Sequence, residues 1–292
     1  MGEVIGAGIV SHVPTLVCSE EERLNMNNGK EFTIVTGLHR MRDEIIQKLK
    51  PDTIVIFDTH WHTTYETVVD GRDYFKGYLT SDEMPRTIAS FPYDYPGDPE
   101  LASIIEDIAT STGNNLIHVC RDPNLPVHYG TVNIVHYVGR GERVLSISCA
   151  QTGEPQDFLN FGKVLREAIE RSDRRVVLLA SGGLSHKFFP LSVIRNHESA
   201  DLENVISKEA RDMDLKIISL LEQGKHAEVI DLMPEFLPFA PEGSFGHYLM
   251  MISTLGGEKC TAKGRKMSEY EASVGTGQVH MWFDRPAQGW TA

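Results

Sequence analysis

The sequence predicts an α/β fold, with a central sheet flanked by helices. Short apolar runs rich in Val and Ile alternate along the 292 residues with segments of helical periodicity. Each run is almost continuously apolar, which is typical of strands that are covered on both faces. No repeat, low-complexity stretch or linker rich in Pro, Gly or Ser interrupts the chain, so we expect residues 1–292 to form one domain.

Five segments are predicted to be strands. They combine β-branched residues with a length typical of strands, and turn residues lie between them. Their ranges are 3–10 (EVIGAGIV), 52–58 (DTIVIFD), 143–149 (RVLSISC), 174–181 (RRVVLLAS) and, closing the chain, 276–283 (TGQVHMWF).

Three segments are predicted to be helices. The first covers 98–113, with Asp98 as its N-cap and Gly113 as its stop. The second covers 201–223, where apolar residues recur at helical spacing and Gly224 supplies a left-handed exit. The third lies around 244–257 (SFGHYLMMISTLGG), whereas 84–100 contains four prolines and is predicted to be an irregular loop.

Composition narrows the class of protein. The formal charge of −13 argues against binding to nucleic acid, which needs a basic face. No apolar stretch approaches the roughly 20 residues of a membrane helix, and the N-terminus lacks a secretory leader pattern, so we expect a cytoplasmic protein without membrane contact. The four cysteines form no CxxC pair and are predicted to be buried thiols.

Three histidines follow predicted strands. His12 comes two residues after the strand 3–10, His60 two residues after 52–58, and His186 shortly after 174–181. Reactive groups in open α/β sheets gather beyond the carboxyl ends of strands, so these histidines are candidate ligands or acid/base groups. His62 would point the same way as His60 if the strand continued past Asp58.

A histidine cluster of this kind suits two chemistries. Two histidines and one carboxylate around Fe(II) leave a face open for oxygenase chemistry, and the same donors around zinc would activate water for hydrolysis. Spacing does not decide between them, and any of 41 acidic residues could be the third ligand.

Three other motifs carry weaker signals. HYGT (128–131) suits a loop near a site or an ordinary turn. GTGQ (275–278) precedes a strand rather than a helix, so it favours a tight backbone crossing over a phosphate loop. GGLSH (182–186) lacks the residue order of a serine nucleophile elbow.

Taken together and in their order along the chain, the motifs resemble those of a known family. They are SHVPTL around His12, DTIVIFDTHWH around His60, HYGT with Tyr129, LLASGGLSH ending in His186, PEG with Glu242, and GTGQV. This ordered set resembles class III, LigB-type extradiol ring-cleavage dioxygenases, in particular the homoprotocatechuate 2,3-dioxygenase branch. The resemblance spans essentially the whole chain and implies the class III extradiol fold, with a mixed central sheet.

The resemblance also implies roles for single residues. His12, His60 and Glu242 would bind Fe(II), with Trp61 packed beneath His60 and His62 outside the ligand set. His186 would act as acid and base, and Tyr129 would hydrogen-bond the substrate or oxygen. The position before that tyrosine is commonly acidic in the family, whereas this chain has His128.

The implied reaction is ring opening of a catechol by O2. A catechol with an acidic side chain, such as homoprotocatechuate, follows from the branch, and Arg121 is the candidate partner for its carboxylate. A 2-aminophenol substrate is the alternative, and the family implies a homo-oligomer. Two rivals stay open: a zinc hydrolase built on Asp58, His60 and His62, and a binding protein of the same fold.

Overall fold

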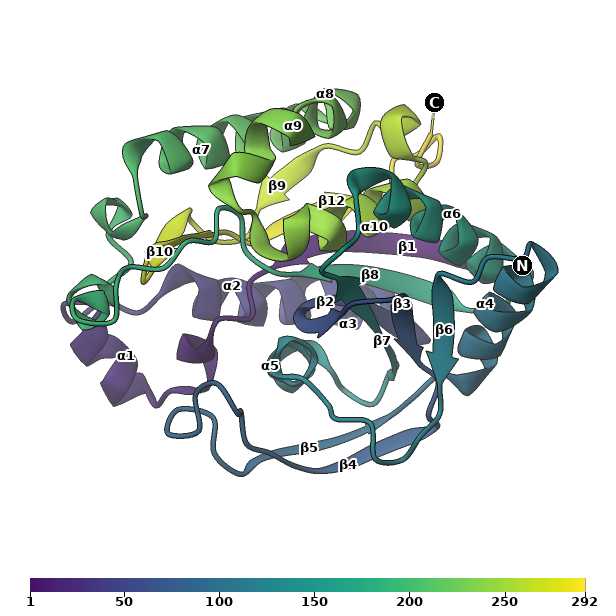
Figure 1. The fold of residues 1–292 in the computed structure, drawn as a ribbon, viewed down its shortest axis with the longest axis horizontal. Coiled ribbons are helices and arrows are strands. Elements are labelled where there is room, and N and C mark those ends of the chain that lie inside the picture. The colour runs from purple at the N-terminus through teal and green to yellow at the C-terminus, as the bar shows by residue number, and fades with distance from the viewer. Residues whose placement is uncertain (292) are drawn as a thin grey trace.

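The computed structural model describes residues 1–291 and is built on an eight-stranded mixed sheet (Figure 1). In spatial order its strands are β6 (Ile117–Cys120), β3 (Thr67–Asp70), β7 (Arg143–Ala150), β2 (Thr53–Thr63), β8 (Arg175–Ser181), β1 (Glu3–Val10), β12 (Met281–Asp284) and β9 (Gly264–Lys266). The four central strands β7, β2, β8 and β1 run parallel, and antiparallel partners flank them on both sides. The predicted α/β class with a mixed sheet is confirmed.

Helices cover both faces of this sheet. One core packs against α4 (Pro99–Ser111), α6 (Pro155–Arg171), α7 (Lys208–Gln223), α8 (His226–Asp231), α9 (Met233–Phe236) and α10 (Gly246–Thr254). The other packs against α2 (Thr33–Met41), the π-helical turn Arg42–Ile46, α3 (Gln47–Leu49) and α5 (Tyr129–Val138). Apolar strand residues alternate between these two cores, which explains why the strand sequences are almost continuously apolar.

Smaller elements complete the chain. They are α1 (Glu20–Met26), the hairpin of β4 (Tyr74–Leu79) and β5 (Phe91–Pro96), the hairpin of β10 (Glu271–Ser273) and β11 (Thr276–Gln278), and 3-10 turns at Pro14–Val17, Ile194–His197, Leu202–Asn204, Leu237–Phe239, Glu242–Phe245 and Gly257–Lys259. Within residues 1–291, no helix is long and apolar enough to cross a membrane.

The predicted strands agree with the structure in position, with two differences. The strand predicted at 52–58 continues as β2 to Thr63, with a register shift against β7 between Asp58 and His62. The strand predicted at 276–283 is two short strands, β11 and β12, with different partners. The close backbone crossing that GTGQ indicated is at Gly275 (φ 117°), where a Cβ would lie 2.3 Å from the backbone oxygen of Lys187.

The prediction of an irregular loop over 84–100 is wrong in part. Residues 91–96 form β5, which pairs with β4 alone. Pro92 and Pro96 are tolerated because this two-stranded ribbon lies outside the main sheet (Figure 1), where a missing N–H need not break a central ladder. Residues 80–90 form the turn of the ribbon and reach the site described below.

The helix predicted over 201–223 starts later than expected. It begins at Lys208, because Ser207 caps the backbone N–H of Ala210, and the preceding residues form a 3-10 turn. Its exit at Gly224 (φ 73°) is as predicted. The helix expected at 98–113 is α4, capped by Asp98, and the helix around 244–257 shortens to α10.

Candidate active site

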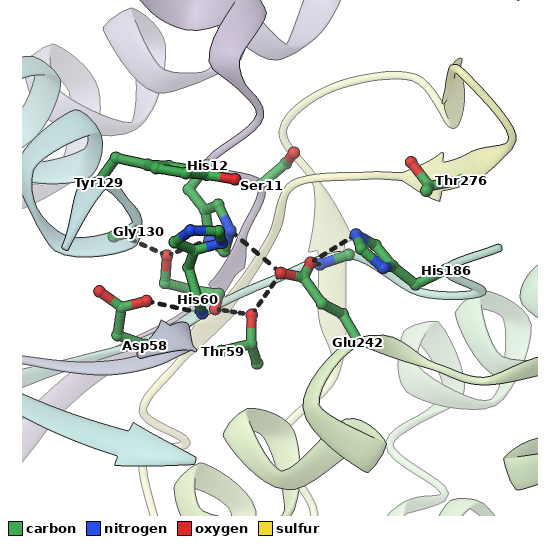
Figure 2. Close-up of polar contacts among 12 residues, drawn as sticks. Ser11, His12, Asp58, Thr59, His60, Tyr129, Gly130, His186, Glu242 and Thr276 are labelled. Atoms are coloured by element: carbon green, nitrogen blue, oxygen red, sulfur yellow. Dashed lines mark hydrogen bonds and ion pairs between the residues drawn. The ribbon is translucent and has the colours of Figure 1, made fainter. Parts of the chain in front are cut away.

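The carboxyl ends of three adjacent parallel strands meet at one edge of the sheet. β1, β8 and β2 are neighbours and run in the same direction. His12 and His186 follow the ends of β1 and β8, and His60 lies in the last part of β2. Figure 2 shows these three side chains together with Glu242 in one cluster. The tertiary structure therefore places a carboxylate 182 residues from His60 among histidines that come from three strands.

His12 is buried and held in one orientation. Its Nδ1 lies 2.9 Å from the Ser181 hydroxyl, and that hydroxyl donates to the carbonyl of Gly130 at 2.7 Å. Because serine has a single hydroxyl proton, Nδ1 of His12 must be the donor in their hydrogen bond. The other nitrogen, Nε2, faces Glu242 Oε1, 3.1 Å away. Burial would lower the pKa of His12, but the neighbouring Glu242 more than offsets it and raises the pKa above its ordinary value.

Glu242 is buried at the centre of the cluster. The Thr59 hydroxyl donates to its Oε1 at 2.7 Å, and the backbone N–H of Gly183 donates to its Oε2 at 2.5 Å. Burial alone would raise the pKa of Glu242, but His12 and His186 more than offset it and hold the pKa well below its usual range. Glu242 is therefore a carboxylate at neutral pH.

The backbone after Glu242 is unusual. Gly243, Ser244 and Phe245 have φ values of 54°, 55° and 60°, so three successive residues adopt the left-handed conformation. This conformation is costly for the two residues that carry a side chain. The turn joins Glu242 to α10 and keeps Gly243 against Thr59, where a Cβ would lie 2.7 Å from the Thr59 methyl group.

His60 is oriented by the residues before and after it. The buried carboxylate of Asp58 accepts the backbone N–H of His60 at 2.9 Å and that of Trp61 at 3.2 Å, at the point where β2 shifts register. The ring of Tyr129 lies 3.7 Å from the His60 ring, centroid to centroid. Burial, followed by the nearby His12, lowers the pKa of His60 to about 4, so its imidazole is neutral.

The neighbours of His60 are placed differently from the prediction. Trp61 stacks on His128 at 5.6 Å rather than beneath His60, where Tyr129 lies instead. His62 is exposed, on the rim of the cavity. His128, where the family commonly has an acidic residue, does not line that cavity. It stacks on Trp61 instead, so this difference affects the packing of Trp61 and not the cavity wall.

Tyr129 and His186 lie on either side of the cluster (Figure 2). Tyr129 opens α5 and donates its hydroxyl to Glu83 at 3.1 Å. His186 Nε2 lies 3.8 Å from Glu242 Oε2, and its backbone N–H donates to the carbonyl of Ala240. The preceding Ser185 is fixed through its N–H and hydroxyl by the buried carboxylate of Asp214.

The cluster opens into a cavity of about 510 Å³. All five residues that the sequence singled out, His12, His60, Tyr129, His186 and Glu242, line it. Apolar walls surround them, and the ribbon turn contributes Glu83, whose Oε2 lies 3.4 Å from His60 Nε2. This volume is large enough for a small substituted aromatic molecule.

The donor set fits a divalent metal ion. His12 Nε2 faces the Glu242 carboxylate at 3.1 Å, and a proton or a cation must lie between these two atoms because their lone pairs would otherwise repel each other. His60 adds an imidazole that is neutral, since burial lowers its pKa to about 4. Within residues 1–291, however, no three His, Cys, Asp or Glu side chains are already gathered as a metal site, and the ion-pair partner of His60 is Glu83.

Two other predicted contributors lie elsewhere. Arg121 pairs with Glu106 at 2.9 Å and lines a different pocket, so it is not a partner for a substrate in this cavity. Both oxygens of Asp58 are occupied by backbone N–H groups and the Thr131 hydroxyl. Asp58 therefore supports the loop of His60 and is not free to build a site with His62.

Sequence reasoning missed the residues that orient the cluster. Asp58 and Thr59 directly precede His60, and Ser181 and Gly183 lie in the run that ends at His186. The polar side chains of Asp58, Thr59 and Ser181 inside apolar strands are the signal that could have found them, since a buried polar group requires a partner. Gly183 and Glu83 carried no such signal.

Known proteins match this sequence over almost its entire length. A family model described as the catalytic LigB subunit of aromatic ring-opening dioxygenase matches residues 6–284. The 3,4-dihydroxyphenylacetate 2,3-dioxygenase of Escherichia coli is 30% identical over 90% of this chain and 94% of its own length. The 2-aminophenol 1,6-dioxygenase beta subunit of a Pseudomonas species is 28% identical over 95% of this chain and 93% of its own.

A solved structure supports the fold. The crystal structure of an uncharacterized protein from Escherichia coli K12 superposes with a TM-score of 0.61 and covers 95% of this chain and 99% of its own. The two sequences are 11% identical, so this similarity supports the fold alone.

Proposed function

Because the chain belongs to the LigB family of aromatic ring-opening dioxygenases, we propose that it is an Fe(II)-dependent extradiol dioxygenase that opens the ring of a catechol with O2. His12, His60 and Glu242 would hold the iron. His186 would be the acid and base, and Tyr129 would hydrogen-bond the substrate.

One observation carries the ligand assignment. The Ser181 hydroxyl fixes His12 so that Nε2 faces the Glu242 carboxylate at 3.1 Å, in the wall of a substrate-sized cavity. Fixing of a ligand histidine through its other nitrogen is characteristic of metal sites. Thr59 and Gly183 hold the carboxylate in the same way.

The iron would supply adjacent open positions that bring an electron-rich aromatic diol and O2 together. The protein supplies orientation and proton transfer. His186 stands on the cavity wall opposite His12 and His60 (Figure 2), so its Nε2 can take a proton from a catechol hydroxyl and return it when an O–O bond breaks. Both oxygen atoms then enter the product.

Tyr129 is suited to donate rather than accept. Burial, then the neighbouring Glu83 and Glu242, raise the pKa of Tyr129, so its hydroxyl keeps its proton. The ring is held by its contact with His60. A protonated, fixed hydroxyl on the cavity wall can hydrogen-bond an oxygen of the substrate.

A 2-aminophenol is the second candidate substrate class. The relative whose name refers to 2-aminophenol shares 28% identity over nearly the full chain, and an amino group is close in size to the hydroxyl that it would replace. A panel that contains both classes separates the two.

The test is anaerobic loading with Fe(II), followed by oxygen and a panel of catechols and 2-aminophenols. We expect iron to bind at one per chain, one O2 to be consumed per substrate, and a ring-opened product to absorb visible light. A protein that binds zinc and hydrolyses esters without O2 uptake would instead support the hydrolase. A protein with no turnover of any panel member would contradict the proposed function.

A further inference from the structure

The cavity of the proposed active site has an unbalanced set of fixed charges. Three carboxylates line it, Glu83, Glu198 and Glu242, and no Lys or Arg is among its lining residues within 1–291. Glu242 belongs to the proposed iron site. Glu83 and Glu198 make no ion pair with any Lys or Arg of the described chain, so they present their charge to the cavity.

Two cations that lie near cavity residues in sequence are used elsewhere. Lys187, next to His186, is exposed and donates to the carbonyl of Pro238 at 2.8 Å. Arg23 is held by Glu31 at 2.7 Å. Arg86 and Arg195, each three residues from a carboxylate of the cavity, are exposed and are not among the residues that line it.

The remaining walls are apolar. They include the side chains of Met26, Met84 and Phe188. An anionic group placed among such walls loses its hydration and requires a cation or several hydrogen-bond donors in exchange. An uncharged group requires neither.

We propose that Glu83 and Glu198 select against anionic ring substituents, so that the substrate is a catechol whose substituent carries no negative charge. This inference rests on the proposed function and refines it. It replaces the expectation of an acidic side chain, whose intended partner, Arg121, lies outside the cavity.

The position of Glu83 makes it the stronger determinant. It lies in the ribbon turn 80–90, and its carboxylate contacts both His60 Nε2 and the Tyr129 hydroxyl. A substrate held by Tyr129 and the iron ligands would have Glu83 as a neighbour. Glu198, which also lines the cavity, adds a second negative charge.

The test compares substrates of one skeleton. The pair is 3,4-dihydroxyphenylacetate and its methyl ester, which differ by one negative charge, and unsubstituted catechol reports the ring-opening reaction itself. We expect kcat/KM for the ester to exceed that for the acid by at least about tenfold. Repulsion between the substrate carboxylate and one nearby glutamate, at an effective dielectric constant of about 20, is sufficient for this ratio. Anaerobic calorimetry should give the same order in Kd.

Charge variants separate this effect from hydrophobicity of the ester. Glu198→Lys and, independently, Glu83→Gln should shift the acid-to-ester ratio toward the acid by about tenfold or less. The controls are at Glu222, on the exposed surface of α7: Glu222→Lys matches the charge change of Glu198→Lys, and Glu222→Gln matches that of Glu83→Gln. Both should leave the ratio unchanged.

The outcomes are distinguishable. If catechol is cleaved and the acid equals or exceeds the ester, the selectivity proposal is wrong while the dioxygenase stands. If both variants shift the ratio no more than their matched controls at Glu222 do, Glu83 and Glu198 are not the determinants. If neither catechol nor any derivative is opened, the proposed function itself fails.

Discussion

At the scale of single residues, the orientation of His12 depends on a serine that never contacts the cavity. Ser181 gives its proton to Gly130, and this obliges His12 to donate from Nδ1. Nε2 is therefore the nitrogen that is left to face Glu242, where a metal ion can take the place of its proton.

The two histidines of DTHWH are predicted to differ in function. His60→Ala should abolish stoichiometric iron binding, because it removes one of three proposed ligands. His62→Ala, which alters an exposed side chain on the rim, should keep it. Metal content after anaerobic loading and desalting measures both. Full iron content in His60→Ala, or loss of iron in His62→Ala, would reverse the assignment.

His186 is predicted to affect turnover and not metal content. His186→Phe should bind iron normally while kcat falls by about 10²- to 10⁴-fold, the usual range for an acid/base group. His118→Phe, the same change at an exposed histidine of β6, should retain wild-type kcat. Wild-type activity in His186→Phe would remove His186 from the mechanism.

At the scale of elements, β2 shows how a strand can present a ligand at its end. Its parallel pairing with β7 slips between Asp58 and His62, and Asp58 turns back to accept the two backbone N–H groups of His60 and Trp61. The strand thus stays hydrogen-bonded while the His60 ring turns toward the cavity. Such irregularities are common next to active sites.

The start of α5 fits closely against this irregularity. A Cβ on Gly130 would lie 2.1 Å from Asp58 Oδ1, a distance at which something must move. Gly130→Ala should lower the free energy of unfolding by about 1–3 kcal/mol, the usual cost of overpacking, and weaken iron binding through displacement of Asp58. Urea unfolding and iron titration measure the two effects. An unchanged unfolding midpoint together with unchanged iron affinity would contradict this account.

At the scale of the whole molecule, Asp214 connects distant segments around the loop of His186. This buried carboxylate on α7 accepts hydrogen bonds from Ser185, which follows β8, and from Tyr270, which precedes β10. The chain ends are joined as well, because β1 and β12 pair in the central sheet. We propose on this ground that residues 1–292 fold as one catalytic domain.

Asp214 also predicts a pH dependence of stability. Burial raises its pKa to about 6 from an unfolded value of 3.8. Since the folded pKa is the higher one, its contribution to stability is complete below about pH 4 and is lost as the pH rises through about 6, by up to about 3 kcal/mol. Asp214→Asn should remove that part of the slope between pH 4 and 7 in urea unfolding. Parallel wild-type and variant profiles would show that Asp214 titrates normally.

The sequence by itself determined the fold class, the positions of the central strands and the residues worth testing. Strand periodicity and caps are local properties, so 3–10, 143–149 and the start of α4 were predictable. It did not predict β5 or the late start of α7. These depend on where a hairpin leaves the sheet and which serine caps a helix, both of which the surrounding packing decides.

Only the tertiary structure decided how the site is built and what surrounds it. The contact of Glu242 with His12, the support of Asp58 and Ser181, and the placing of Arg121 outside the cavity are distances between residues far apart in sequence. The same is true of the charge of the cavity, to which the turn 80–90 brings Glu83. The order of the motifs in a sequence can indicate the family of a protein and its reaction. The charges that select a substrate depend on residues that the fold brings together from separate segments.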